Sequence, residues 1–276
     1  MHRVTLASLC RGCEGDKQFM CNLDYASAVD QLIALRLGTE KLVALSPECR
    51  PQTIAQGYEI QAALHRSRQA LGHGPYAGFK IGCTTAVMQA YLGIPEPCAG
   101  GILAANLHDS GAVFQTTSRR LGVECEIAVR LKLPLGGDGT PTMLEARAAV
   151  GSVMAAIELV EDRYEDWRTM DAPTLIADDF FQRACILGTP IPDWQAYDLA
   201  GLTGEMTING SEPLSGRGGD ILGHPLEALR WLAGRTALAA GSVVMLGSVV
   251  QTQWLNPGDH VQIRLGTVST ASLSVT

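Results

Sequence analysis

The segment 123–129 constrains the fold of this chain more than any other. Its apolar residues alternate with Glu124 and Glu126, which is the period of a β-strand, so both carboxylates should leave the same face of one strand. Carboxylates two residues apart, roughly 6–7 Å along a strand, repel each other unless positive charge lies between them. Two interpretations fit: a solvated strand face that continues through Arg130 and Lys132, or a site for a hard divalent cation, which takes oxygen ligands.

A third carboxylate, Glu158, lies within an otherwise apolar or small run at 150–160. A carboxylate buried in such a run needs a partner, a proton or a metal ion. Glu158 would otherwise reach solvent at the end of a strand, or pair with Arg163. A metal site formed by Glu124, Glu126 and Glu158 would explain both anomalies together.

Size and charge exclude several classes of protein. The 276 residues suffice for one large domain, or for a domain with a smaller lobe. The net charge is −7 and no basic cluster stands out, which argues against nucleic acid as the main partner. No apolar run reaches the roughly 18 residues of a membrane span, and the apolar stretch at 4–10 is short and weakly flanked for a signal peptide. We therefore expect a cytoplasmic protein with no membrane partner.

The eight cysteines are spaced irregularly, and several occupy apolar, strand-like positions. That usage favours reduced, buried cysteines over a disulfide framework. Cys10 and Cys13 form a CxxC pair, but no second pair and no histidine at ligand spacing accompany it, so zinc is not expected there. The sequence leaves the role of this pair open.

Hydrophobic periodicity and turn residues divide the chain into helices and strands. Helices are predicted at 25–37, 51–71, 84–92 and 225–238, and strands at 102–104, 111–115, 123–131, 153–160, 242–246 and 261–275. The Asn209-Gly210 pair predicts a tight hairpin turn. We expect a loose extension at 1–22, a small helical N-terminal lobe at 23–75 and a β-rich catalytic domain at 76–276, which together make an α+β fold.

Two basic residues are candidates for substrate contact. Lys80 lies between Gly78 and Gly82 on one face of a predicted strand, and glycine at both positions clears space beside its side chain. Lys80 would neutralise a substrate carboxylate, or transfer protons if burial lowers its pKa; the alternative is an exposed strand face. Arg163 would hold a carboxylate through two hydrogen bonds, or pair with a nearby acid such as Asp162.

Other motifs are less informative. The glycine-rich stretch 215–219 matches no nucleotide-binding pattern and is expected to be a loop. No GxSxG motif supports a serine hydrolase. The six histidines show no metal-ligand spacing, and His108 is expected to be structural.

Five segments, in order and at matching spacing, resemble the fumarylacetoacetate hydrolase superfamily, most closely its 2-keto-4-pentenoate hydratase and 4-oxalocrotonate decarboxylase branch. They are Lys80-Ile-Gly-Cys-Thr84, Val123-Glu-Cys-Glu126-Ile-Ala, Ala156-Ile-Glu158-Leu-Val-Glu-Asp162-Arg163, Gly223-His-Pro-Leu and Pro257-Gly-Asp259. The resemblance covers roughly 50–276. It implies a mixed β-roll or sandwich core of the C-terminal-domain type of that family, with a metal site near its centre, in a homo-oligomer.

The resemblance also implies a metal and a substrate. Glu124, Glu126 and Glu158 would bind Mg²⁺ or Mn²⁺, and the ion would chelate the carboxylate and the 2-oxo oxygen of a short 2-oxo acid. The implied activity is that of a lyase, a hydratase that adds water to a 2-hydroxy-2,4-dienoate or 2-oxo-4-enoate in the catabolism of aromatic-ring cleavage products.

The same resemblance assigns roles to individual side chains. Lys80 and Glu126 would be catalytic, with Lys80 as a nearby cation or proton shuttle. Lys80, Arg163 and Cys98 would contact the substrate. Relatives commonly carry Pro-Asp, an aromatic residue and Gly where this chain has Pro-Cys98-Ala-Gly, so a candidate proton donor is replaced by a thiol, a weak hydrogen-bonding group.

That departure keeps three alternatives open. The first is a decarboxylase of the 4-oxalocrotonate type. The second is a C–C hydrolase of the acylpyruvate type, which would need a Glu–His pair to activate water, and no histidine is an obvious partner. The third is a non-catalytic relative that binds 2-oxo acids.

Overall fold

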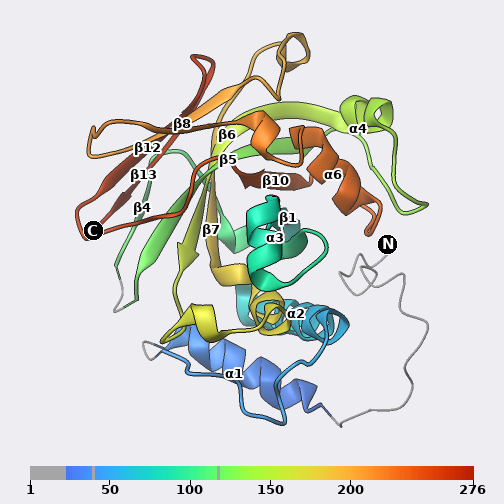
Figure 1. Ribbon diagram of the computed structural model, residues 1–276, viewed down its shortest axis with the longest axis vertical. Helices are drawn as coiled ribbons and strands as arrows, with labels where there is room; N and C mark the ends of the chain where they lie inside the picture. Colours follow the sequence, from blue (N-terminus) through green and yellow to red (C-terminus); the bar gives the residue numbers. More distant parts are fainter. Residues whose placement is uncertain (1–22, 39–40, 117–118) are drawn as a thin grey trace.

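The computed structural model describes residues 23–38, 41–116 and 119–276. The expected extension at 1–22 and its CxxC pair lie outside the described residues. Figure 1 shows the two N-terminal helices at one end of the molecule, with the strands and the other helices in the remainder. The α+β class expected from the sequence is confirmed, because helices and mixed sheets share one chain.

The first two helices begin at side chains that cap them. α1 (Tyr25–Leu37) follows Asp24, and α2 (Ile54–Arg68) follows Thr53; each capping oxygen accepts a hydrogen bond from a backbone N–H of the first turn. A π-helical turn (Gln69–His73) ends α2 at the glycines that the sequence marks as a stop.

Helix α2 packs against a short helix that comes much later in the chain, α5 (Ala172–Ala177). A Cβ atom at Gly57 would lie 2.5 Å from the carbonyl oxygen of Pro173, so only glycine permits this approach. The division into an N-terminal lobe and a catalytic domain stays a prediction.

The larger sheet has eight strands and a curled shape. They are β1 (Tyr76–Gly82), β2 (Cys98–Leu103), β3 (Leu107–Asp109), β5 (Leu121–Leu131), β6 (Val150–Glu161), β7 (Gln182–Pro190), β10 (Val243–Ser248) and β11 (Gln253–Trp254). Their spatial order is β2-β1-β10-β5-β6-β7-β3, with β11 beside β5. Three strand spacings separate β1 from β6, about 14 Å in a flat sheet. The Nζ atom of Lys80 on β1 nevertheless lies 3.4 Å from Oε1 of Glu158 on β6, so the sheet curls and both side chains occupy its concave face.

A five-stranded sheet packs against the larger one. Its strands are β4 (Ala112–Phe114), β8 (Thr203–Ile208), β9 (Leu214–Arg217), β12 (His260–Leu265) and β13 (Ser269–Val275), in the order β4-β13-β12-β8-β9. Side chains of β12 alternate between exposed and buried, so one face is solvated and the other joins the core. A Cβ atom at Gly188 on β7 would lie 2.2 Å from the carbonyl oxygen of Thr270, which shows how closely the two sheets approach.

Several predicted elements differ in extent from the observed ones. The range 261–275 holds two strands, β12 and β13, rather than one. The Asn209-Gly210 turn joins β8 to β9 with positive φ at both residues, 53° and 71°, as a type I′ turn requires. The stretch 215–219, expected to be a loop, contributes to the edge strand β9 and to a 3₁₀ turn (Gly218–Asp220), because Gly204 and Gly216 pair across the hairpin.

Three further helices lie within the β-rich segment. They are α3 (Ala86–Leu92), α4 (Met143–Ala149) and α6 (Pro225–Ala233). The sequence predicts α3 and α6, although α6 ends at Ala233, five residues earlier than expected, with Gly234 as its C-cap. It misses α4, which begins with a reciprocal capping box between Thr142 and Glu145.

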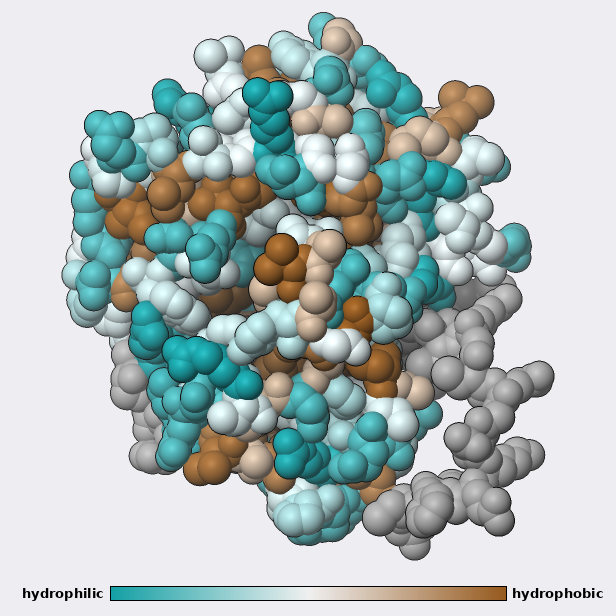
Figure 2. Space-filling view, in the orientation of Figure 1, coloured by the Kyte–Doolittle hydropathy of each residue, from teal (hydrophilic) through white to brown (hydrophobic). Residues whose placement is uncertain are grey.

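Helix α3 is the least buried helix of this segment. None of its residues is buried, and Val87 and Tyr91 are 78% and 53% exposed. Figure 2 shows hydrophobic residues at the surface near the centre of the view, where Figure 1 places α3. Within the described part of the chain, no helix has the length and hydropathy needed to cross a membrane.

Candidate metal centre and active site

Three glutamates meet on the concave face of the larger sheet. Glu124 on β5 is the direct cross-strand partner of Glu158 on β6, and Glu126 follows Glu124 by two residues, so all three side chains leave the same face. One oxygen from each carboxylate lies within 4.8 Å of the other two. Glu126 and Glu158 are each 1% exposed and Glu124 is half-buried, which rules out a solvated strand face.

Two of the carboxylates are fixed by groups from β10 and from the loop that follows it. The backbone N–H of Gly247 donates to Oε2 of Glu126 at 2.7 Å, and the Thr252 hydroxyl donates to Oε1 of Glu124 at 2.5 Å. Gly247 has a φ of 132°, and a Cβ there would lie 2.7 Å from Oγ1 of Thr84. These contacts were not predicted, since nothing in the sequence pairs residues more than a hundred positions apart.

The electrostatics of this cluster favour a bound cation. Burial raises the pKa of Glu158 to about 7 against the opposing charge of Lys80. Burial and the charges of Glu158 and Glu124 raise the pKa of Glu126 well above its usual range. Oε1 of Glu158 is buried and has no hydrogen-bond partner. Three crowded carboxylates with an unsatisfied oxygen therefore fit a hard divalent ion, which would replace their protons.

Among the described residues, Lys80 is the cation that forms an ion pair with one of the three carboxylates. Its Nζ lies 3.4 Å from Oε1 of Glu158 and donates to the carbonyl oxygen of Phe180 at 3.4 Å. The side chain is 4% exposed, so the alternative of an exposed strand face is wrong. Burial by itself lowers the pKa of Lys80, but Glu158 and Glu124 outweigh it and the pKa is raised. The condition under which Lys80 would act as a base, a pKa lowered by burial, is therefore not met, and its role as a cation near the substrate stays a prediction.

The glycines around Lys80 have two different functions. Cβ atoms at Gly82 and Gly100 would lie 3.6 Å from Nζ and 3.2 Å from Cε of Lys80, so both residues leave room for its side chain. A Cβ atom at Gly78 would instead lie 1.9 Å from the carbonyl oxygen of Val243. Gly78 thus permits the close pairing of β1 with β10. The role that the sequence analysis gave to Gly78, clearing space beside Lys80, belongs to Gly100 together with Gly82.

The structure corrects the assignment of Arg163 to substrate binding. Its guanidinium is 1% exposed and all three nitrogens are engaged: Nε with Glu161 at 3.2 Å, Nη1 with Asp178 at 2.9 Å and Nη2 with the carbonyl oxygen of Gln182 at 2.7 Å. Neither Glu158 nor Asp162, the partners that the sequence suggests, is among these contacts. Of its two acidic partners, Glu161 precedes Arg163 by two residues, and Asp178 comes from a segment that folds against it.

Cys98 occupies the first position of β2 and is 3% exposed. Interaction with the Cys83 thiol and burial raise the pKa of the Cys98 thiol. Since Cys98 pairs with Gly82 and Gly100 pairs with Lys80, the Cys98 side chain leaves the same face of the sheet as Lys80. A role for Cys98 in contacting substrate stays a proposal.

The sequence analysis missed a buried contact between His65 and Asp179, which lies next to the residues that contact Lys80. Nε2 of His65 lies 2.6 Å from Oδ2 of Asp179, and Nδ1 lies 2.6 Å from the Tyr76 hydroxyl. Asp179, Phe180 and Phe181 all have positive φ, and the carbonyl that accepts from Lys80 belongs to Phe180. Three such residues in succession are strained and need the contacts around them.

The engagement of His65 bears on the hydrolase alternative. Its ring is fully buried and both nitrogens are occupied, so it has no free nitrogen with which to activate water. In the part of the chain that the structure describes, no hydrogen bond or ion pair joins a histidine to Glu124, Glu126 or Glu158.

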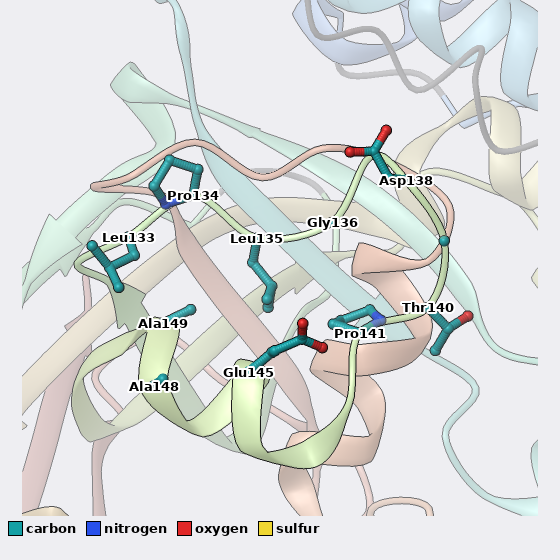
Figure 3. Close-up of a pocket in the computed structure, with 11 residues that line it drawn as sticks. Leu133, Pro134, Leu135, Gly136, Asp138, Thr140, Pro141, Glu145, Ala148 and Ala149 are labelled. Carbon is teal, nitrogen blue, oxygen red and sulfur yellow. The ribbon is translucent and has the colours of Figure 1, made fainter.

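A surface hollow elsewhere does not coincide with this site. It measures about 430 Å³ and lies between the loop after β5 and helix α4 (Figure 3). Glu145 is the acid nearest its centre in Figure 3, but its carboxylate already accepts from the N–H and the hydroxyl of Thr142. None of the three clustered glutamates lines it, so we assign it no role in the chemistry.

Comparison with known proteins places the chain in a family. The model of the fumarylacetoacetate (FAA) hydrolase C-terminal family matches residues 99–276, which include all three glutamates. The chain belongs to the fumarylacetoacetate hydrolase family. It is 30% identical to a 4-oxalocrotonate decarboxylase from Pseudomonas putida over 226 residues, 79% of this chain and 84% of that one.

Two further family members are similar along most of their length. A 2-hydroxyhexa-2,4-dienoate hydratase from Comamonas testosteroni is 29% identical over 243 residues, 85% of this chain and 91% of the hydratase. The solved structure of a 4-oxalocrotonate decarboxylase from Pseudomonas putida G7, complexed with magnesium and adipate, superimposes with a TM-score of 0.85 at 24% identity and covers 95% of this chain and 100% of its own. The last comparison confirms the expected fold.

Proposed function

We propose that this protein is a divalent-metal-dependent lyase that adds water to a short 2-hydroxy-2,4-dienoate, with Glu124, Glu126 and Glu158 as metal ligands. One observation carries the proposal: three carboxylates, two of them buried and one half-buried, bring ligand oxygens within 4.8 Å of one another, and Lys80, 3.4 Å from Oε1 of Glu158, is the one cation of the described residues that pairs with them. The hydratase name of one similar relative, and the magnesium bound by the structure with the same fold, support it.

The glutamates fit Mg²⁺ or Mn²⁺ because carboxylates are the ligands that these hard ions prefer. Bound there, the ion supplies a Lewis acid for the carboxylate and 2-oxo oxygens of a 2-oxo acid. Gly247 and Thr252 keep Glu126 and Glu124 in place for this role, as groups that orient metal ligands do in other proteins.

Lys80 performs the other tasks that the chemistry requires. Its ammonium group attracts the anionic substrate to a site whose own side chains are acidic. From the same position the protonated amine can deliver a proton to the carbon skeleton as the dienol tautomerises. The backbone carbonyl of Phe180 and the carboxylate of Glu158 fix Nζ in that position. Cys98, on the same face of the sheet, forms part of the pocket wall beside Lys80.

A decarboxylase is the second candidate, because the 30%-identical relative carries that name. The same centre would withdraw the electrons left behind by CO₂. Both activities use the three glutamates and Lys80, so the geometry of the centre is common to the two candidates.

The decisive assay supplies the purified protein with 2-hydroxypenta-2,4-dienoate and Mg²⁺ and follows the loss of dienol absorbance. Hydration predicts metal-dependent loss that is abolished by EDTA and by Glu126→Gln. Glu212→Gln, which removes an exposed carboxylate from the β8–β9 turn, is the matched control and should retain full activity.

Release of CO₂ from 4-oxalocrotonate without hydration of the dienoate would identify the decarboxylase instead. Mg²⁺ binding by calorimetry with no turnover of either substrate would contradict both enzymes and favour the non-catalytic binding relative.

A further inference from the structure

Two cysteines, Cys83 and Cys98, lie close together where β1 ends and β2 begins, near Lys80. Cys98 pairs directly with Gly82, the last residue of β1, and directly paired Cα atoms in antiparallel strands lie about 4.5–5.5 Å apart. Cys83 follows Gly82 with a φ of 57°, so the chain leaves the strand there. The interaction between the two thiols raises the pKa of Cys98 and lowers that of Cys83, in keeping with the closeness that this strand register imposes.

The two thiols differ in how easily a reagent reaches them. Five described cysteines are reduced, and four of them are buried, whereas Cys83 is partly exposed. A reagent in solution would therefore meet Cys83 first, with Cys98 directly behind it.

The surroundings also activate Cys83. The interaction with Cys98 and the charge of Lys80 lower the pKa of the Cys83 thiol against the effect of burial. Lys80 Nζ lies 3.6 Å from the Cβ position of the intervening Gly82. A thiolate beside an ammonium group is the nucleophilic form of cysteine.

We propose that Cys83 is a thiol modification site at which low-molecular-weight disulfides, such as oxidised glutathione, close an intramolecular disulfide with Cys98. In the first step the Cys83 thiolate attacks one sulfur of the reagent, and the other sulfur leaves as a thiolate. In the second step the Cys98 thiol gives its proton to that departing thiolate and attacks Cys83, which expels a second small thiol. Two protein thiols are oxidised and one small disulfide is reduced to two thiols, so atoms and electrons balance.

The second step becomes feasible once the first has occurred. The largest cause of the raised pKa of Cys98 is its interaction with Cys83, ahead of burial. A mixed disulfide at Cys83 removes the negative charge that holds the Cys98 proton. Cys98 then resolves the mixed disulfide, as the buried partner does in other two-cysteine sites.

The disulfide would act on the catalytic centre through its position. It would join the end of β1 to the start of β2 and close the segment that carries α3 at both ends. Because Lys80 packs against Gly82 and Gly100, on either side of this link, oxidation would shift the surroundings of Lys80. This inference goes beyond the proposed function, and its chemistry can be read without any substrate.

The test uses the intact protein and tryptic mapping. Cys83 and Cys98 are the cysteines of one tryptic fragment, 81–119, and the cysteines at 10, 13 and 21 fall on other fragments. Treatment with oxidised glutathione should make this fragment lighter by two hydrogen atoms, and dithiothreitol should restore its mass. Chymotryptic cleavage at Tyr91 should leave the two halves joined until reduction.

Three variants complete the experiment. Cys83→Ser should abolish both the reaction and the disulfide, whereas Cys98→Ser should leave a mixed disulfide on Cys83 that persists. Cys49→Ser, at a buried position remote from the pair, should behave as wild type. In wild type, iodoacetamide should modify Cys83 about ten-fold faster than Cys49.

Two results would overturn the proposal. One is a stable mixed disulfide on wild-type Cys83 while Cys98 remains alkylatable after denaturation. The other is a fragment 81–119 that stays fully reduced in the folded protein under conditions that oxidise it after denaturation in urea. Neither result depends on whether the protein hydrates dienoates, so this inference and the proposed function fail separately.

Discussion

Two buried charge clusters flank Lys80, and they have opposite electrostatic character. The first is the carboxylate centre of Glu124, Glu126 and Glu158, where acids outnumber bases. The second is an ion-pair network beneath α1 and α2, in which every acid contacts at least one basic side chain. Its members are Arg36, His65, Arg68, Glu161, Arg163, Asp178 and Asp179. Glu126 and Glu158 are as deeply buried as the acids of the network, whereas Glu124 is half-buried.

A pair of acids shows the contrast. Burial alone would raise the pKa of both Glu158 and Asp179. For Asp179, His65 and two arginines outweigh burial and hold the pKa below its usual value. For Glu158, Lys80 opposes burial but does not overcome it, and the pKa rises to about 7. A buried acid that keeps a raised pKa identifies a place for a ligand, whereas one with a lowered pKa belongs to the scaffold.

The largest expected effect comes from breaking the carboxylate centre. Glu158→Gln keeps the shape of the side chain and removes one ligand charge, so we expect kcat/KM to fall about 10⁴-fold, on the order of 5 kcal/mol in the barrier. The melting temperature checks that the variant folds, because relief of the repulsion from Glu124 and Glu126 is offset by loss of the buried ion pair with Lys80. Retained Mg²⁺-dependent turnover would remove Glu158 from the centre.

The next effect comes from breaking the ion-pair network. Arg163→Met leaves Asp178 and Glu161 short of a buried partner, so we expect a loss of about 3–5 kcal/mol in the free energy of unfolding, measured with urea. KM should be unchanged for the molecules that remain folded. Arg168→Met is the control: Arg168 pairs with Asp166 on the surface and its loss should cost below about 1 kcal/mol.

A rise in KM for Arg163→Met without loss of stability would contradict a purely structural role and indicate that Arg163 binds the substrate. The two substitutions therefore have opposite expected results. Glu158→Gln should abolish activity in a protein that still folds, and Arg163→Met should lower stability without changing the active site.

The pH dependence of metal binding gives a smaller effect with a definite sign. The raised pKa of Glu158 means that this group stabilises the metal-free fold fully below about 4.5 and that this contribution is lost as pH rises to about 7. A metal ion must displace the retained proton, so below pH 7 the affinity for Mg²⁺ should fall about ten-fold per pH unit for each proton released. Calorimetry in two buffers of different ionisation enthalpy counts those protons.

Asp179 provides the internal contrast for this experiment. Its lowered pKa means that its contribution to stability is present at neutral pH and is lost only as pH falls below its unfolded value, near 3.8. Stabilisation of the fold by Mg²⁺ should therefore grow between pH 5 and 8 while the ion-pair network stays intact. Mg²⁺ affinity that is constant over this range would contradict the raised pKa of Glu158.

The sequence predicts the carboxylate centre better than the network, and the reason is geometric. Strand alternation alone places Glu124 and Glu126 on one face, and an acid in an apolar run marks Glu158. No comparable local rule links Arg163 to Asp178, which belongs to a segment that ends a different helix. Which acid an arginine meets depends on how whole elements pack.

Elements were missed for similar reasons. Strand β7 was not predicted because its residues 184–187 are buried on both faces, so it lacks the alternation of a half-exposed strand. The Asp179–Phe181 turn was missed because its positive φ values occur at residues that rarely adopt them. Both features are imposed by the rest of the fold, and the turn supplies the carbonyl that orients Lys80.

The smallest expected effect comes from removing a hydrogen bond that orients one carboxylate of the centre. Thr252→Val keeps the side-chain shape and removes the hydroxyl that donates to Oε1 of Glu124. Outer groups that orient metal ligands typically contribute 10–100-fold to affinity, and because Glu124 is half-buried we expect the lower end, about ten-fold weaker binding of Mg²⁺. Thr207→Val, at a half-buried position of strand β8, is the control and should bind Mg²⁺ as wild type does. If Thr252→Val binds Mg²⁺ unchanged, Glu124 is oriented by the ion alone, and the centre would be less preorganised than the ion-pair network beside it.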